Sequence, residues 1–329
     1  MRRIGTWAGR LLALVLLALA ALWLFGPREA VDTDVAFDAS SMPDDLDGWL
    51  ADREGQVPDL DPEARKRILW AGAPGDVTDL AIVYLHGFSA TSWELRPVPN
   101  MLGERLGANV YLTRLTGHGR TGAALARADA GDWVEDLAQA MAIGRAIGRR
   151  VVVIGTSTGG TLAGVLATDP DLVDAADGLA GVVFVSPNFR VANPAARLLS
   201  WPLARHWLPL VAGRTRSFTP MNARHARHWT TEYPTRALLP MQALIDHADG
   251  LDWSAARSPA LFLFAPEDTV VDHAATERVA AGWGPPAAVR RVAVPPGDDP
   301  DAHVIAGDIL SPGGTQTLTP IIAEWIADL

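Results

Sequence analysis

The chain has 329 residues, of which 49% are hydrophobic, so it can bury a large core in one domain with an insertion or in two domains. It contains no cysteine, which excludes disulfides, thiolate catalysis and thiolate metal sites. Its formal net charge is −10, which argues against nucleic acid as a partner.

The N-terminus has a basic flank followed by an apolar run. Fifteen uncharged residues, Leu11 to Phe25, end at Gly26-Pro27, and three arginines precede them: Arg2, Arg3 and Arg10. This pattern is typical of an export signal or a signal anchor. The cleavage-like pattern Ala18-Leu19-Ala20 lies inside the apolar run, which favours an uncleaved transmembrane anchor over residues 1–30. Cytoplasmic arginines would place the rest of the chain on the periplasmic or extracytoplasmic side.

A strand and a glycine turn come next, after a segment (31–77) that is interpreted as a tether and lead-in and that is acidic and irregular from Val31 to Pro58. Leu80 to Leu85 predicts a buried strand, and His86-Gly87-Phe88 follows it. A glycine here lets the loop fold back and point a backbone N–H at a reacting oxygen. We therefore expect Phe88 to be an oxyanion-hole donor and His86 and Gly87 to support it. The alternative is an ordinary strand-to-loop turn.

The next predicted elements are a helix, a strand and a second helix. Trp93 to Leu106 suits a helix, although Pro97 and Pro99 indicate a late start, and Asn109 to Thr113 suits a strand. The strand ends in Leu115-Thr116-Gly117-His118-Gly119. His118 lies between two glycines, and a histidine in such a turn more often ties down the loop than binds substrate. Asp132 to Ile147 predicts an amphipathic helix.

The most informative motif follows that helix. Val151 to Ile154 predicts a buried strand, Gly155-Thr156-Ser157-Thr158-Gly159 comes directly after it, and Thr161 to Leu166 has a helical pattern. A strand turns into a helix over one residue only if that residue is strained, and flanking glycines let other backbone pass close by. The motif predicts Ser157 as an exposed nucleophile with the Thr158 N–H as an oxyanion donor. The alternative is a tight turn with an incidental serine.

Two later strands supply the partners of this serine. Leu261 to Ala265 is followed by Asp268, and Arg290 to Val294, the last predicted strand, is followed by His303 and a helix at Thr319 to Ala327. The carboxyl ends of parallel strands are where such sheets place their chemistry. The chain order serine, aspartate, histidine is the order that the G-x-S-x-G motif calls for.

Two alternatives concern these acidic residues. Asp272 is a rival for the acid, four residues beyond Asp268. The loop that ends at His303 also contains four side chains that could bind a metal ion: Asp298, Asp299, Asp301 and His303. A solvated acidic loop explains these residues better.

The chemistry needs each of these residue types. A neutral serine hydroxyl is a weak nucleophile, so an imidazole must take its proton. A buried carboxylate fixes the imidazole tautomer and stabilises the imidazolium. This reaction needs no metal or organic cofactor.

Taken together, these segments resemble the α/β-hydrolases, in particular the monoacylglycerol lipase-like esterases and serine aminopeptidase-like hydrolases. The resemblance is carried by the motifs around His86, His118 and Ser157, and by two later segments: Ala265 to Val271 and Ala302 to Val304. It implies an α/β-hydrolase fold, a mostly parallel central sheet with helices on both faces. The threonines on either side of Ser157 depart from the more usual histidine and methionine, at positions that supply backbone and packing.

A basic segment interrupts the strand-helix rhythm from Asn188 to Asp246. Eight arginines face Glu232 and Asp246, a net charge of 8 − 2 = +6. Placed between the sixth and seventh core strands, it predicts a helical cap over Ser157, whose apolar residues line an acyl pocket or form the cap's own core. Three interpretations of its arginines are open: they are solvated, they attract an anionic substrate, or they face anionic phospholipid. The predicted units are 1–30 anchor, 31–77 tether and lead-in, 78–187 first core part, 188–247 cap and 248–329 second core part.

The sequence thus predicts a membrane-anchored serine hydrolase. Its partners would be a membrane and a small-molecule carboxylic ester with an apolar acyl chain, cleaved through an acyl-enzyme. An amidase, peptidase or acyltransferase uses the same triad and differs only in its leaving-group pocket. A non-catalytic, membrane-tethered binding protein on the same fold is the alternative from another class.

Overall fold

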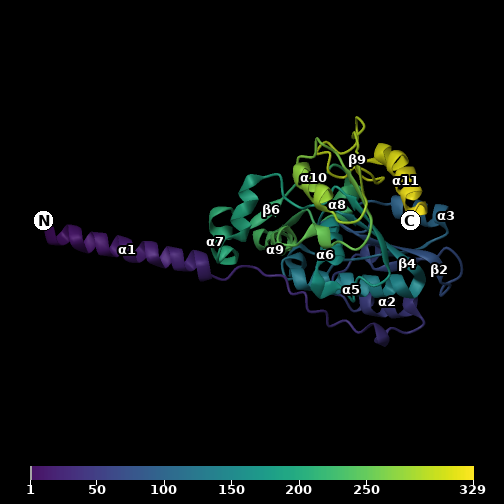
Figure 1. Ribbon diagram of the computed structural model, residues 1–329, viewed down its shortest axis with the longest axis horizontal. Coiled ribbons are helices and arrows are strands. Elements are labelled where there is room, and N and C mark those ends of the chain that lie inside the picture. Colours follow the sequence, from purple (N-terminus) through teal and green to yellow (C-terminus); the bar gives the residue numbers. More distant parts are fainter. Residues whose placement is uncertain (1) are drawn as a thin grey trace.

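A seven-stranded sheet forms the centre of the protein (Figure 1). The computed structural model describes residues 2–329. The strand order is β1-β3-β2-β4-β5-β8-β9, and only β1, which pairs with β3, runs antiparallel. The strands are β1 (Arg67–Leu69), β2 (Thr78–Leu85), β3 (Asn109–Leu112), β4 (Gly148–Thr156), β5 (Leu179–Val185), β8 (Ala260–Phe264) and β9 (Ala287–Arg291). The predicted mostly parallel sheet is confirmed.

Helices cover both faces of the sheet, which explains why its central strands are apolar throughout. In β4, Val151 and Val153 belong to one core with α5 (Ala130–Ile147), α6 (Thr158–Thr168) and α10 (His273–Gly282). Val152 and Ile154 belong to the other core with α3 (Val98–Leu106) and α11 (Pro312–Ala327). Successive side chains of a strand point to opposite faces, so four adjacent β-branched residues serve two cores.

Two predicted boundaries lie too far along the chain. The last strand, β9, begins at Ala287 rather than Arg290, because it follows the register of β8, whose Ala260 it pairs with. The terminal helix α11 begins at Pro312 rather than Thr319. The Asp298 carboxylate accepts the N–H groups of Gly313 (3.2 Å) and Gly314 (2.9 Å), so a distant acid supports the first turn of this helix.

The predicted cap region lies between β5 and β8, the fifth and sixth strands of the sheet rather than the sixth and seventh. It contains η4 (Pro194–Ser200), α7 (Ala204–Val211), β6 (Thr215–Ser217), α8 (Ala223–His228), β7 (Glu232–Pro234), η5 (Thr235–Ala237) and α9 (Leu238–Asp249). β6 and β7 form a separate antiparallel pair. Leu244 of α9 is fully buried in the same core as α5 and α6, so α9 joins the insertion to the main body.

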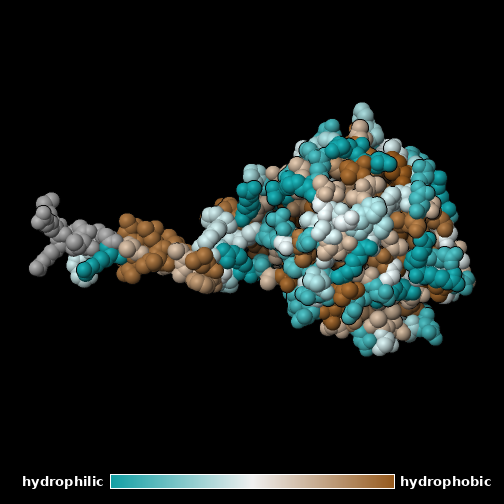
Figure 2. All heavy atoms as spheres, in the orientation of Figure 1, coloured by the Kyte–Doolittle hydropathy of each residue, from teal (hydrophilic) through white to brown (hydrophobic). Residues whose placement is uncertain are grey.

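The N-terminal helix α1 (Arg2–Phe25) extends away from the body of the protein, and its apolar side chains form the brown stalk of Figure 2. Leu11, Leu17 and Phe25 are among its exposed residues. The predicted basic side chains of Arg2 and Arg3 lie outside the described residues. No helix in the part of the chain that the structure describes is long and apolar enough for a membrane span, so the predicted transmembrane helix is not found.

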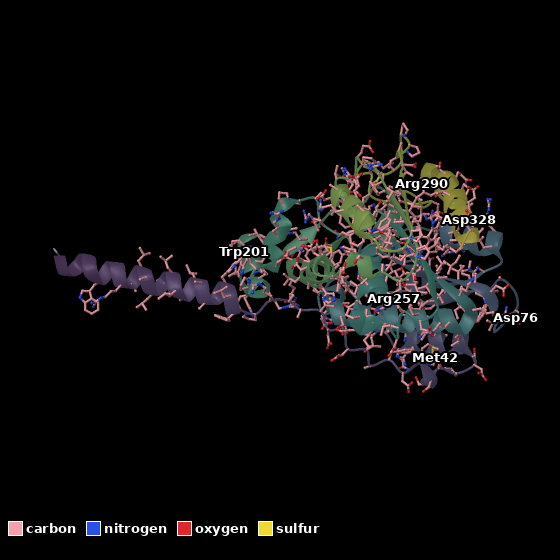
Figure 3. The ribbon with its side chains drawn as sticks, viewed as in Figure 1. Met42, Asp76, Trp201, Arg257, Arg290 and Asp328 are labelled. Atoms are coloured by element: carbon pink, nitrogen blue, oxygen red, sulfur yellow. The ribbon has the colours of Figure 1, made fainter. Side chains whose placement is uncertain are left out.

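The segment after α1 is fastened to the insertion (Figures 1 and 3). Trp23 packs edge-on against Trp201, with ring centroids 5.4 Å apart. The Leu203 N–H donates to the Pro27 carbonyl (2.8 Å). The Arg205 guanidinium makes two hydrogen bonds of 2.7 Å to the Glu29 carboxylate. These contacts fix the exit of α1 against η4 and α7.

The lead-in segment is fastened to the core by a buried ion pair. Glu54 of α2 (Leu46–Gly55) makes hydrogen bonds of 2.6 and 2.7 Å to Arg114, and both residues are at most 5% exposed. Burial raises the pKa of Glu54, but the hydrogen bond and charge of Arg114 outweigh that effect, and the net pKa is lowered. Because the pKa of Glu54 is lower in the folded chain than in the unfolded chain, its ionised carboxylate stabilises the fold at pH values above the ordinary carboxyl pKa. This stabilisation is lost as the pH falls through the lowered pKa of the folded chain.

Replacing Glu54 by Gln is expected to lower the free energy of unfolding by about 3–5 kcal/mol, because it leaves the Arg114 guanidinium buried without its counter-charge. Urea unfolding followed by circular dichroism measures this. The exposed pair of Arg149 and Asp79 provides the control, since Asp79→Asn should cost less than about 1 kcal/mol. A loss for Glu54→Gln no larger than that of the control would contradict the expectation.

Candidate active site

Ser157 stands at the turn between β4 and α6 with φ 52° and ψ −116°, a conformation that is strained for a residue with a side chain. Its N–H donates to the Val185 carbonyl of the neighbouring strand (3.1 Å). Its carbonyl accepts from Gly160 (2.9 Å), Thr161 (3.1 Å) and Asn188 (3.0 Å). Strand β5 and helix α6 therefore hold the turn from both sides.

The glycines of the motif make this turn possible. A Cβ on Gly155 would collide with the Gly159 carbonyl oxygen. A Cβ on Gly159 would collide with the Leu85 carbonyl and lie 2.8 Å from the His86 oxygen. The end of β2 thus packs directly against the first turn of α6, which brings the His86 loop next to Ser157.

His303 and Asp268 meet although they are far apart in the chain. His303 Nδ1 lies 2.8 Å from Asp268 Oδ2, and the other carboxylate oxygen accepts the N–H groups of Val270 (2.8 Å) and Val271 (2.9 Å). Both residues are nearly buried. A carboxylate held by two backbone donors orients the imidazole, so that Nδ1–H donates to Asp268 and Nε2 is left to accept a proton.

The environment of His303 favours its protonated form. Burial lowers its pKa, but the hydrogen bond and charge of Asp268, helped by Glu94 and Asp299, outweigh burial and raise it. Within residues 2–329 the Ser157 side chain makes no capping hydrogen bond to α6. Proton transfer from Ser157 to His303 stays a prediction. In enzymes of this kind, the hydrogen bond between nucleophile and base often shortens only when substrate is bound.

The rival acid, Asp272, faces elsewhere. It is the N-cap of α10 and accepts the Ala274 N–H (3.0 Å). Arg190 and Arg278 approach it at 3.9 and 4.0 Å. Of the two candidates, Asp268 alone is hydrogen-bonded to His303.

The acidic loop before His303 uses its carboxylates to hold backbone. Asp298 accepts N–H groups at the start of α11, and Asp299 accepts those of His303 (3.1 Å) and Val304 (2.8 Å). Asp301 accepts the Thr269 hydroxyl (3.0 Å). Among the described residues no group of three or more histidine, cysteine, aspartate or glutamate side chains suits a metal ion. The loop therefore positions His303 through local hydrogen bonds.

The loop after β2 lies beside the nucleophile, because a Cβ on Gly87 would be 3.0 Å from the Ser157 Cβ. His86 accepts the Leu115 N–H at Nε2 (3.0 Å), so its Nδ1–H donates to the Gly87 carbonyl (2.9 Å). Burial lowers the pKa of His86 to about 4, which keeps this arrangement neutral. Among the hydrogen bonds of residues 2–329, neither the Phe88 nor the Thr158 N–H serves as a donor, so both remain open to an oxyanion.

His118 packs behind this loop. Its ring contacts that of His86, with centroids 4.9 Å apart, and its Nδ1 lies 3.2 Å from the Thr116 carbonyl. Burial and the neighbouring His86 hold its pKa well below the ordinary value. His118 therefore supports the loop, as its sequence context indicates.

Glu94 is the residue of this site that the sequence pattern missed. Its carboxylate is buried and accepts the Gly87 N–H (2.7 Å) and the Tyr84 hydroxyl (3.2 Å). The sequence predicted Trp93 to Leu106 as a helix, where a glutamate is ordinary, but α3 begins only at Val98. Nothing in the spacing sets Glu94 apart from a surface glutamate.

Side chains of the insertion lie directly on this loop. Trp229 and Phe218 form one cluster with Ala90 and Val304, neighbours of Phe88 and His303 in the chain. Tyr233 packs edge-on against Phe88, with ring centroids 5.3 Å apart. Ser157 is 6% and His303 9% exposed, and the aromatic residues contact the chain next to both of them.

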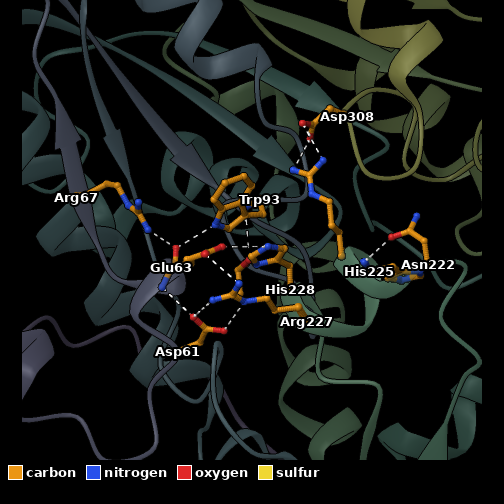
Figure 4. A network of polar contacts seen from close by, with 11 residues as sticks. Asp61, Glu63, Arg67, Trp93, Asn222, His225, Arg227, His228 and Asp308 are labelled. Atoms are coloured by element: carbon orange, nitrogen blue, oxygen red, sulfur yellow. Dashed lines mark hydrogen bonds and ion pairs between the residues drawn. The ribbon is translucent and has the colours of Figure 1, made fainter.

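Ion pairs around α8 add to the attachment (Figure 4). Arg227 pairs with Asp61 (3.1 Å) and Glu63 (3.0 Å), and Arg224 pairs with Asp308 (3.0 Å). The ring of His228 stacks on Trp93, with centroids 4.6 Å apart. Four of the eight arginines of the segment pair with acidic groups outside it, so they are not simply solvated: Arg190, Arg205, Arg224 and Arg227.

Comparison with known proteins identifies the family. Residues 82–307 match the model of the alpha/beta hydrolase family. The chain belongs to the alpha/beta hydrolase family, as its motifs indicate. No curated protein sequence matches it.

Solved structures with the same fold include three lipolytic proteins. A structure from the description of LipS and LipT, two metagenome-derived lipolytic enzymes, has 20% identity and a TM-score of 0.66 over 82% of this chain and 100% of its own. The monoacylglycerol lipase of Paleococcus ferrophilus has 14% identity and a TM-score of 0.58 (80% and 98%). A soluble variant of monoglyceride lipase from Saccharomyces cerevisiae, in complex with a substrate analogue, has 13% identity and a TM-score of 0.58 (89% and 98%). At these identities the likeness establishes the fold.

The two candidate acids can be separated without any assay of activity. Asp268→Asn is expected to lower the pKa of His303, because it removes the carboxylate charge that raises it, whereas Asp272→Asn should leave it in place. Nitrogen-15 NMR of the labelled histidine rings during a pH titration gives this value. A larger effect of Asp272→Asn would exchange the two assignments.

Proposed function

We propose that the protein is a serine hydrolase that cleaves carboxylic esters through an acyl-enzyme. The observation that carries the proposal is the His303–Asp268 pair, because an imidazole held by a buried carboxylate is the base that a serine nucleophile needs. The strained turn at Ser157 and the two open N–H groups of Phe88 and Thr158 add support.

The reaction follows from these groups. His303 Nε2 takes the proton of Ser157 as its Oγ bonds to the acyl carbon, and the carbonyl oxygen becomes an oxyanion that accepts the Phe88 and Thr158 N–H groups. The oxyanion collapses, the alkoxide leaves and takes the proton from His303, and an ester on Ser157 remains. Water, deprotonated by His303, then attacks this ester, and the bond from the acyl carbon to the Ser157 Oγ breaks as His303 returns the proton to that oxygen. The carboxylic acid is released, and Ser157 and His303 are restored.

The proposed substrate is a small ester with an apolar acyl chain. The surfaces next to the loop are aromatic: Tyr233 contacts Phe88, and Trp229 and Phe218 lie beside Ala90. Apolar rings favour a chain that leaves water, at roughly 0.8 kcal/mol for each buried CH₂. The lipolytic character of proteins with the same fold agrees with this choice.

Membrane attachment through α1 is the second part of the proposal. Its apolar side chains from Leu11 to Phe25 are exposed, although Trp23 contacts Trp201, and exposed apolar surface of this extent favours lipid. An extracytoplasmic side for the catalytic body, the expectation from Arg10 and the arginines before it, needs a membrane span that residues 2–329 do not provide, so the proposal is attachment of α1 to a membrane surface.

Ser157→Ala is expected to abolish ester turnover and labelling by a fluorophosphonate, because no other group of the site replaces its oxygen. The fold should persist, since the change removes one oxygen atom at a turn. Peptide mass spectrometry of the labelled wild-type chain locates the adduct, and hydrolysis of p-nitrophenyl acetate, butyrate and decanoate measures turnover. Ser254→Ala, in a surface turn with Asp252, is the matched control.

The outcomes separate the candidate activities. A label on Ser157 with ester turnover supports the proposal, and preference for the longer chain supports the apolar acyl site. A label without ester turnover favours amide hydrolysis or acyl transfer. No label on the folded protein favours a binding protein and contradicts the proposal.

Deleting residues 2–25 is expected to move the protein from the membrane pellet to the supernatant, because it removes the apolar helix and keeps Pro27 and Glu29 bound to the insertion. Fractionation of cells, followed by a high-salt wash, measures this. The intact Ser157→Ala chain should stay in the pellet. A truncated chain that still sediments with the membranes would contradict attachment through α1.

A further inference from the structure

Glu94 is a buried carboxyl group that the reaction derived above does not use. It is 3% exposed, although it lies in the turn between β2 and α3 rather than in the sheet. Its Oε2 accepts the Gly87 N–H at 2.7 Å and the Tyr84 hydroxyl at 3.2 Å. Burial of a carboxyl group is costly unless it is hydrogen-bonded, so this placement depends on both donors.

Gly87, the first hydrogen-bond partner of Glu94, sets the direction of the Phe88 N–H, the proposed oxyanion donor. The carbonyl of Gly87 and the N–H of Phe88 belong to one planar peptide and point in opposite directions. His86 Nδ1 holds that carbonyl at 2.9 Å, and the Ala90 N–H approaches it at 3.3 Å. Glu94 holds the N–H at the other end of the same glycine. Gly87, the most flexible residue type, is thereby fixed at both ends, and the Phe88 N–H takes one direction.

Its second partner connects the loop to the nucleophile. The Tyr84 hydroxyl, which donates to Glu94, also lies 3.2 Å from the hydroxyl of Thr156, the residue before Ser157. A Cβ on Gly87 would lie 2.7 Å from the Glu94 carboxylate and 3.0 Å from the Ser157 Cβ, so Gly87 lies against both residues. Glu94 therefore joins the two strand ends that carry the oxyanion donor and the serine.

We propose that Glu94 is a positioning residue of the hydrolase site, whose carboxylate fixes the Gly87–Phe88 peptide for the oxyanion. This inference rests on the ester hydrolysis proposed above. Glu94 touches neither the substrate nor the reacting atoms, and acts through Gly87 and through its charge.

The charge acts on His303 directly. The titratable groups that act on the ionisation of Glu94 are Tyr84 of β2 and His303 of the loop after β9. Burial raises the pKa of Glu94 to about 7, against the effects of Gly87, His303 and Tyr84. In return, ionised Glu94 is among the groups that raise the pKa of His303. Removal of the charge therefore lowers the pKa of His303.

Two variants of the full-length chain separate the two roles. Glu94→Gln keeps an oxygen for the Gly87 N–H but loses the charge, so kcat should fall by less than about tenfold, while the acid limb of kcat/KM moves to lower pH. Glu94→Ala leaves the Gly87 N–H without an acceptor, so kcat should fall by about 10²- to 10³-fold with little change in KM, as for loss of one oxyanion donor. Hydrolysis of p-nitrophenyl butyrate between pH 5 and 9 measures both.

The matched control is Glu54→Gln, which removes an equally buried carboxylate that bonds Arg114 and touches no residue of the Gly87 loop. It should lose stability but keep kcat and the acid limb. The inference is overturned if Glu94→Gln leaves the acid limb in place, or if Glu94→Ala keeps kcat within about threefold of the wild type. If Glu94→Ala does not fold, the pH profile of Glu94→Gln decides alone.

The same experiment tells failure of this inference from failure of the proposed function. A wild-type chain that neither hydrolyses the ester nor takes the fluorophosphonate label on Ser157 contradicts the function, and with it the inference. An active wild type with unchanged Glu94 variants contradicts only the inference.

Discussion

The site depends on one constraint, the close contact between the end of β2 and the first turn of α6. The Leu85 carbonyl leaves no room for a side chain at Gly159, and this contact brings Gly87 against Ser157. The strained φ of 52° at Ser157 is tolerated because β5 and α6 bind its N–H and its carbonyl. Packing of the sheet and α6 supplies the free energy that offsets the strain of the Ser157 turn. The position of Ser157 beside Gly87 follows from this packing.

Two histidines of the site illustrate how a neighbour decides protonation. His86 and His303 are both buried, and burial lowers the pKa of each. His86 has backbone partners and stays neutral, with a pKa of about 4, which suits a residue that only holds the Gly87 carbonyl. His303 faces Asp268 and has a raised pKa, which suits a base that must accept a proton.

Local patterns indicated Ser157, Asp268 and His303, whose catalytic roles stay a prediction. Ser157, Asp268 and His303 each follow a strand, and the parallel order of the sheet brings the strand ends together. The sequence did not predict the role of Glu94, because this role depends on a turn whose course is set by tertiary contacts. The first turn of α11 was not predicted for the same reason. The side chain that accepts its N–H groups is Asp298, fourteen residues before Pro312 in the sequence. Propensity within a window carries no information on such partners.

The attachment of the insertion combines two kinds of contact with different strengths. The pairs of Arg224 and Arg227 are about half exposed, and each is worth about 1 kcal/mol or less. Trp229 lies at the centre with 8% exposure, and burial of an aromatic side chain contributes about 1.5–3 kcal/mol. The apolar contact over Ala90 and Val304 therefore stabilises the attachment of the insertion more than any single ion pair. Because that contact lies over the chain neighbours of Phe88 and His303, the insertion is attached most strongly where it meets the candidate site.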